Sequence, residues 1–160
     1  MMKKNALIYL ILVFAGCIIG VLLVYLVPTA PMTLENESRY DFETTITTVQ
    51  QSATASGWSI PIVHDLQKSL AKAGKEVNKV QVFALCNPEH SVKILAGDDD
   101  RIYSNMMPCR VSVYTKSDGK TYISRLNIPK MSKQMPKNTK TVMKAAYRDI
   151  EKILSGIIVK

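Results

Sequence analysis

The sequence predicts an α+β domain in which helices pack on an antiparallel sheet, preceded by one transmembrane helix. Three observations lead to this fold class. A long uncharged run lies near the N-terminus. Short β-branched runs then alternate with short amphipathic segments, most of them bounded by Gly or Pro. Finally, the turn residues Ser117–Gly119 separate two runs of strand character, as in a hairpin. The 160 residues allow one modest domain besides the apolar run.

The first predicted element is the apolar run from Ala6 to Val27, which follows Lys3 and Lys4. A helix of this length spans about 33 Å, which is enough to cross a bilayer core. A cleavable signal peptide has a shorter apolar region, and Pro28 suits a cleavage site poorly. The positive-inside rule places residues 1–5 in the cytoplasm. We therefore expect a single-pass protein of the bacterial inner membrane with a periplasmic domain.

One alternative for this segment stays open. The stretch Val13–Cys17 resembles a bacterial lipoprotein box, which would make Cys17 a site of lipidation. Ten more residues of the run follow Cys17, where a lipoprotein normally becomes polar. We therefore expect an uncleaved anchor at 6–27, a polar linker at 28–38 and the folded domain at 39–160.

The first half of the folded domain is predicted to alternate helices and strands. Gly57 follows the first helix as a C-terminal cap, because glycine readily adopts the left-handed conformation. Pro61 lacks an N–H group, so the strand that contains it is expected at a sheet edge or a bulge. The predicted elements are a helix around Ile46–Ala53, a strand at Trp58–Val63, an amphipathic helix at Asp65–Ala73 and a buried strand at Val80–Leu85.

The second half is predicted to contain a short helix, a hairpin and a long final helix. Asn87 is a favourable N-cap, and Pro88 suits the first helical position because an N–H there would have no partner. Apolar residues form one stripe of the final helix. The elements are the helix from Pro88, strands Cys109–Tyr114 and Thr121–Leu126, and a helix from about Thr139 with the stripe Val142, Ala146, Ile150, Ile153 and Ile157.

The chain is basic, with 21 Lys and Arg against 13 Asp and Glu, and most of the excess follows residue 130. Four cations recur at every fourth position of the final helix: Lys140, Lys144, Arg148 and Lys152. Such a face is commonly solvated, and beside a membrane it would be attracted to anionic lipid. Nucleic acid is not an expected partner, because the domain is predicted outside the cytoplasm and no aromatic residues interleave these cations.

Several motifs carry a family resemblance. "CNP" at 86–88, "PCRVSVY" at 108–114 after two methionines, "DGK" at 118–120 and "RLN" at 125–127 resemble the bacterial domain-of-unknown-function family 302. The resemblance covers about Phe42 to Leu154. It implies a β-α-β(4)-α fold, related to the TATA-binding-protein-like architecture, and it makes a homodimer an expectation. It implies no reaction.

Two cysteines define the candidate site. Cys86 closes one predicted strand and Cys109 opens another, so antiparallel neighbours would bring both thiols to one rim of the sheet. Three interpretations stay open. The pair could be a disulfide, suited to an oxidising compartment, a ligand pair for a metal or cofactor, or a reactive pair in which Cys86 precedes a helix N-terminus.

We expect a non-enzymatic binding or accessory module, because no catalytic motif is present. Its ligand is predicted to be a metal, copper or zinc, or haem, with Cys86, Cys109, Met107 and His64 as the metal ligands. His90 is expected to be solvated. The alternatives are a thiol-redox protein or sulfur carrier that takes a sulfur-containing ligand, and a dimeric interaction domain with a plain disulfide.

Overall fold

The computed structural model describes residue 9 and residues 12–22 and 30–159. The chain divides into two compact units, Met1–Ala30 and Pro31–Lys160. In the first unit, residues 12–22 are helical. Within the described residues, no helix is both long and apolar enough to cross a membrane. The predicted anchor at 6–27 is therefore not supported, although residues 6–8, 10–11 and 23–27 of it lie outside the described part.

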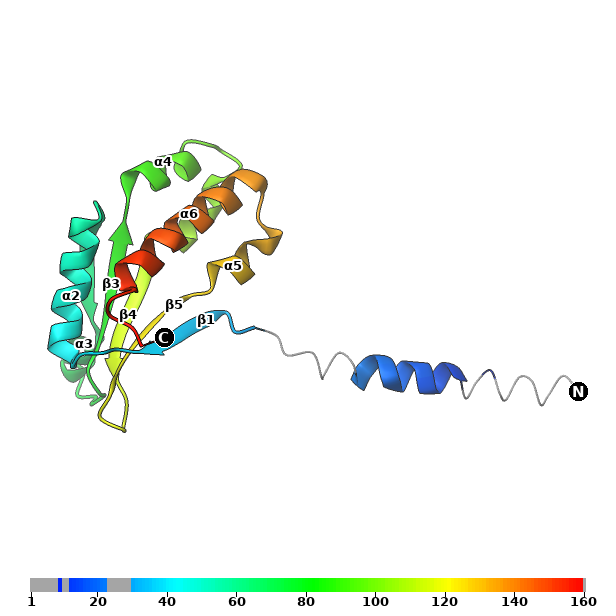
Figure 1. Ribbon diagram of the computed structural model, residues 1–160, viewed down its shortest axis with the longest axis horizontal. Helices are drawn as coiled ribbons and strands as arrows, with labels where there is room; N and C mark the ends of the chain where they lie inside the picture. Colours follow the sequence, from blue (N-terminus) through cyan, green and yellow to red (C-terminus); the bar gives the residue numbers. More distant parts are fainter. Residues whose placement is uncertain (1–8, 10–11, 23–29, 160) are drawn as a thin grey trace, which may run out of the picture. The chain divides into compact units, whose positions relative to one another are not determined.

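The second unit is built on one antiparallel sheet of five strands in the order β1-β5-β4-β3-β2 (Figure 1). The predicted α+β class with a mainly antiparallel sheet is confirmed. If the short helices are set aside, the elements follow the β-α-β(4)-α order that the family resemblance implies. The strands are β1 (Thr33–Glu37), β2 (Ser59–Asp65), β3 (Val80–Cys86), β4 (Cys109–Thr115) and β5 (Thr121–Leu126).

Short helical segments connect the strands, and two longer helices pack on the sheet. Figure 1 shows α6 crossing in front of the strands, with α2 beside it and α4 at the end of β3. The helices are α2 (Phe42–Ala55), α3 (Leu66–Ala71), α4 (Pro88–Leu95), α5 (Ile128–Met131) and α6 (Lys137–Leu154). Two 3₁₀ segments, η1 (Arg101–Met106) and η2 (Ser132–Gln134), complete the set.

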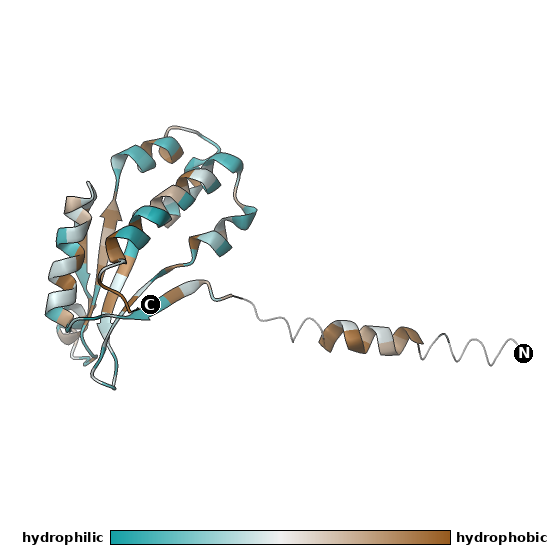
Figure 2. Ribbon diagram, in the orientation of Figure 1, coloured by the Kyte–Doolittle hydropathy of each residue, from teal (hydrophilic) through white to brown (hydrophobic). Residues whose placement is uncertain are grey.

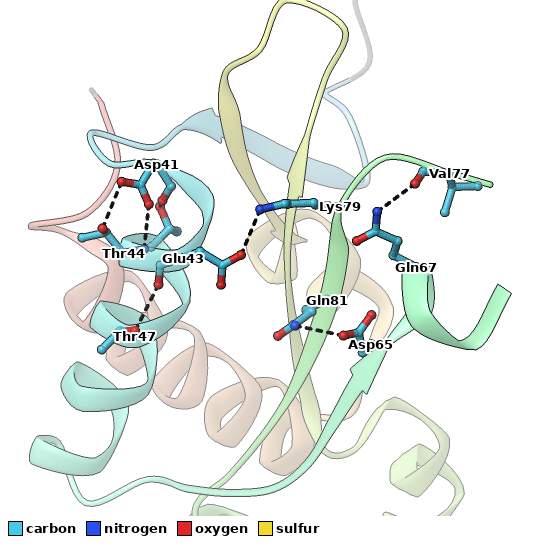
Figure 3. Close-up of polar contacts among 10 residues, drawn as sticks. Asp41, Glu43, Thr44, Thr47, Asp65, Gln67, Val77, Lys79 and Gln81 are labelled. Atoms are coloured by element: carbon cyan, nitrogen blue, oxygen red, sulfur yellow. Dashed lines mark hydrogen bonds and ion pairs between the residues drawn. The ribbon is translucent and has the colours of Figure 1, made fainter. Parts of the chain in front are cut away.

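Side-chain caps and ion pairs fix where α2 begins. The Asp41 carboxylate accepts a hydrogen bond from the backbone N–H of Thr44 at 2.9 Å, which satisfies one of the N–H groups left free at a helix start (Figure 3). In the first turn of α2, Glu43 forms a 3.0 Å ion pair with Lys79, the residue before β3. These contacts tie the start of α2 to the sheet.

The core lies between the helices and one face of the sheet. Phe83 and Leu85 of β3 and Val111 and Val113 of β4 are fully buried there, and α2 and α6 supply the opposing side chains. Figure 2 shows hydrophobic residues recurring along α6 between hydrophilic ones. All five residues of the predicted stripe are buried, and four of them lie on α6: Val142, Ala146, Ile150 and Ile153. The helix ends at Leu154, so Ile157 is a core residue of the segment that follows it.

The structure differs from the predicted linker at 28–38. Thr33–Glu37 is strand β1, paired with β5, and the compact unit begins at Pro31 rather than at 39. The alternation was hard to read because Leu34 is its single apolar residue. Asn36 stands where an apolar residue is usual, and its amide oxygen accepts a 2.8 Å hydrogen bond from the buried Arg125.

The end of the chain returns to β1. The Val159 N–H donates to the Glu37 carbonyl at 2.8 Å, and Ser38 forms a β-bridge with Ile158. Arg39 adds a backbone hydrogen bond to Ile157. The segment that enters the unit and the segment that leaves it are therefore joined side by side.

Candidate functional site

The sheet register places the two cysteines of the second unit next to each other. Strands β3 and β4 are antiparallel, and Leu85 pairs directly with Cys109. Cys86 is the next residue along β3, so it adjoins the same position. The predicted convergence of these two strand ends at one rim is therefore confirmed. Both thiols are free and partly buried.

The two cysteines nevertheless belong to different rows of side chains, which the sequence did not predict. Cys109 lies with Leu85 on the helix-covered face, whereas Cys86 continues the row of Val80, Val82 and Ala84. The Cys86 sulfur lies 3.6 Å from the hydroxyl oxygen of Ser91 in α4. Cys86 therefore sits at the junction of β3 and α4.

The two thiols differ in their surroundings. Burial raises the pKa of the Cys109 thiol to about 11, and the neighbouring Cys86 adds to the increase. A protonated, buried thiol is a poor nucleophile at neutral pH, because the thiolate is the reactive form. Cys109 is therefore suited to be a ligand or a packed side chain rather than an attacking group.

A small cavity of about 20 Å³ lies beside Cys109, under α4. Its walls include Met107 at the start of β4, Met143 of α6, His90 of α4 and Trp58 before β2. A cavity of this size holds about one water molecule or one ion. A thiol, two thioethers and an imidazole thus surround a volume suited to a single small occupant.

His90 is held in a fixed orientation rather than solvated as expected. Its Nε2 lies 2.8 Å from the Asp149 carboxylate of α6, and its side chain is 19% exposed. Its ring also lies 5.7 Å from the Trp58 ring, measured between centroids. A carboxylate that holds one imidazole nitrogen is the usual outer partner of a metal-binding histidine.

The sequence held a signal for this contact. Asp149 interrupts the basic face of the final helix, and it falls three positions after the buried Ala146. The Asp149 side chain is 45% exposed, but its position at the border of the buried stripe places its carboxylate within reach of an element packed on α6. His90 of α4 is its partner there.

His64 is not brought to this site. It pairs with Val82 in the register of β2 and β3, four residues along β3 from Cys86. That separation corresponds to about 13 Å at 3.3 Å per residue. The structure therefore brings together Cys86, Cys109 and Met107 of the predicted ligands, and His90 lies where His64 was expected.

The potential metal ligands at this rim are not all His, Cys, Asp or Glu side chains. Across the residues that the structure describes, no three His, Cys, Asp or Glu side chains are grouped so that they could hold a metal ion. A metal in the cavity would therefore need a thioether besides the Cys109 thiol and the His90 imidazole. Met107 and Met143 are the thioethers available at the cavity.

Comparison with known proteins supports the family and the fold. The model of the family DUF302, a domain of unknown function, matches residues 34–157. The crystal structure of an uncharacterised conserved DUF302 protein from Bacillus stearothermophilus is similar, with a TM-score of 0.71 and 16% sequence identity. The match covers 79% of this chain and 98% of that one. None of the curated proteins matches the chain.

Proposed function

The chain belongs to the DUF302 family, and we propose that it is a binding module that holds one copper(I) ion between β3, β4 and α4. The ligands are the thiolate of Cys109, the thioether of Met107 and the imidazole of His90, whereas Cys86 adjoins the site without lining its cavity. The observation that carries the proposal is the shared cavity: Cys109, Met107 and His90 all line it, and it has room for one ion.

The donor set favours copper(I) over the other ligands considered. Structural zinc takes four nitrogen, oxygen or thiolate ligands, and no three His, Cys, Asp or Glu side chains of the described residues are grouped for this. Thiolates and thioethers are the ligands that copper(I) prefers. A cavity of about 20 Å³ also suits an ion better than a porphyrin.

Binding is accompanied by loss of protons. Cys109 is protonated at neutral pH because its pKa is raised to about 11, so copper(I) takes the place of the thiol proton, which passes to solvent. No electron transfer is needed, because the ion enters and stays in the reduced state. The Asp149 carboxylate keeps the His90 ring in place throughout.

The test is a competition for copper(I) under anaerobic conditions with the full chain. Bicinchoninate, a coloured copper(I) chelator, is titrated against the wild type and Cys109→Ser. We expect Cys109→Ser to lower the affinity by at least about 100-fold, because loss of outer-shell partners alone costs 10–100-fold in metal sites. Met107→Leu, which keeps the side-chain volume, is expected to have a smaller effect in the same direction.

Cys17→Ser is the matched control, because this cysteine belongs to the other compact unit. It is expected to leave the copper(I) affinity unchanged. The proposal is wrong if the wild type cannot compete with bicinchoninate, or if Cys109→Ser competes equally well. Thermal unfolding of each variant checks that the fold is kept.

Two alternatives predict different results for the same cysteines. A thiol-redox protein or sulfur carrier needs an accessible thiol, and Cys86, which is partly exposed beside α4, is the candidate. Rapid alkylation of Cys86 by iodoacetamide, without copper(I) retention, would favour it. An interaction domain with a plain disulfide would instead show a two-dalton mass loss in unreduced protein. Sedimentation analysis would test the expected homodimer.

We also propose that residues 6–27 hold the domain at the bacterial inner membrane, with the domain in the periplasm. The support is the uncharged run after Lys3 and Lys4 and the positive-inside rule. Protease added to spheroplasts is expected to digest the domain and to spare a cytoplasmic control protein. Protection of the domain in intact spheroplasts would contradict this location.

A further inference from the structure

We propose that the face of the sheet away from the helices carries a second site, which binds a small organic anion with an apolar body, such as a medium-chain carboxylate. A cavity of about 310 Å³ lies over β1, β5 and β4, beside η1 and α5. This volume falls in the range of small-molecule pockets, about 300–1,000 Å³. It is about fifteen times that of the cavity beside Cys109.

The pocket has one uncompensated positive charge. Two arginines line it, Arg110 of β4 and Arg125 of β5. Arg125 stands opposite Val111, so its side chain extends to the helix-covered face, where it binds the Glu151 carboxylate through two nitrogens at 2.5 and 2.9 Å. Arg110 is exposed, and within the described part of the chain it forms no ion pair. An anion entering the pocket therefore meets a free guanidinium, which matches carboxylate geometry.

Hydroxyl groups lie next to this charge on the same face. Ser112 and Ser124 stand directly opposite each other on β4 and β5, and both line the pocket. The Ser124 hydroxyl interacts with the Tyr114 hydroxyl, which in turn donates to Glu35. The Ser112 hydroxyl has no hydrogen-bond partner among the described residues, so it is available to donate to a ligand oxygen.

The remaining wall is apolar. Met106 of η1, Pro108, Leu126 of β5 and Met131 of α5 complete the pocket. Methionine side chains adapt to ligands of different shape, because they are unbranched and flexible. One cation and one free hydroxyl beside an apolar wall fit a monoanion with a hydrocarbon body better than a multiply charged phosphate. This distribution of groups identifies the ligand class.

The second site does not depend on the copper(I) proposal. The pocket shares Pro108 with the cavity under α4, and it shares Met106, Arg110, Arg125 and Leu126 with another small cavity that Cys109 lines, but it contains none of the three proposed metal ligands. Arg110 and Cys109 are neighbours in sequence that lie on opposite faces of β4. Failure of one proposal therefore leaves the other intact, and the two tests use different residues.

The experiment follows methionine methyl signals of the full chain by NMR during titration with octanoate at pH 7. Octanoate is expected to shift the Met106 and Met131 signals saturably. Arg110→Gln is expected to weaken binding at least about tenfold, since hydrogen bonds to charged groups contribute roughly 1.5–3 kcal/mol. Octanamide, which has the same body without the charge, and acetate, which lacks the body, are each expected to bind at least about tenfold more weakly than octanoate.

Arg148→Gln is the control, because Arg148 is an exposed arginine of α6 outside the pocket. It is expected to bind octanoate as the wild type does. The proposal is overturned if octanoate gives no saturable shift at Met106 and Met131, or if Arg110→Gln binds equally well. Equal affinity for octanamide would remove the role of the charge, and equal affinity for acetate would remove that of the apolar wall.

Discussion

Strand β4 presents alternate side chains to two different environments. Cys109 and Val111 face the helices, whereas Arg110 and Ser112 face the open side of the sheet. The covered side has an ion-sized cavity and a thiol whose pKa is raised by burial. The open side has a pocket large enough for a small molecule and the guanidinium of Arg110, which has no ion pair among the described residues. Adjacent residues thus acquire different chemistry because helices cover one face only.

The ion pairs of the two faces show the same contrast. On the covered side, Arg125 binds Glu151 while its own side chain is only 6% exposed. On the open side, Lys116 binds Glu35 at 2.6 Å, and both side chains are about 40% exposed. Water screens the second pair but not the first. The buried pair is also bidentate, whereas Lys116 makes a single contact to Glu35, so burial and geometry both favour the buried pair.

The largest expected effect is the loss of the buried pair. Glu151→Ala removes the carboxylate and leaves the buried Arg125 without its counter-charge. We expect about 3–5 kcal/mol of destabilisation, the range for breaking a buried ion pair. Urea unfolding of the full chain, followed by circular dichroism, measures the change. A loss below about 1 kcal/mol would show that Arg125 reaches water.

The next effect concerns pH in the metal-free chain. The Cys109 pKa is raised from 9.0 to about 11 in the folded protein, so the folded state holds the thiol proton more tightly than the unfolded state. This stabilisation is fully present below pH 9 and is lost as pH rises through about 11. It amounts to about 3 kcal/mol at 1.36 kcal/mol per pH unit.

The measurement compares urea midpoints of the wild type and Cys109→Ala between pH 8 and pH 11.5. The wild type is expected to lose more stability than the variant over this range. Tyr114, whose pKa burial raises to about 12, titrates in both proteins and cancels in the comparison. Parallel curves would mean that the Cys109 thiol is not shielded from water.

A moderate effect is expected from the carboxylate behind His90. Asp149→Asn keeps the size of the side chain but removes the charge that holds the imidazole. If His90 is a copper(I) ligand, affinity should fall by about 10–100-fold, as for other outer-shell partners. The bicinchoninate competition measures it. His64→Ala, on the exposed edge strand β2, should leave the affinity unchanged.

The smallest effect is expected on the open face. Glu35→Ala removes the partner of Lys116 and Tyr114. Because these groups remain accessible to water, we expect a loss of less than about 1 kcal/mol. The same urea measurement as for Glu151→Ala allows a direct comparison. A loss as large as that of Glu151→Ala would contradict the contrast between the two faces.

Much of the fold was predictable because its signals are local. The stripe of the final helix, the Asn87 cap and the hairpin at Ser117–Gly119 each follow from a few adjacent residues. Strand β1 was missed because its inward position carries Asn36, whose partner Arg125 is 89 residues away. When an inward position of a strand is polar and its partner is distant in sequence, the polar/apolar alternation that predicts a strand is absent.

The candidate site was predictable only in part, for a similar reason. The neighbourhood of Cys86 and Cys109 followed from their positions at strand ends. The presence of His90 at the site, where His64 was expected, could not be predicted, because it depends on how α4 packs against Asp149 of α6. The open-face pocket was not predicted at all, since it requires the register that sets Ser112 opposite Ser124.

The hydrogen bond between Val159 and Glu37 has a practical consequence for experiments on this protein. A fluorophore or fusion partner attached after the last residue would emerge beside the point where the chain leaves β1. This attachment point is remote in sequence from the cysteine rim and from Arg110.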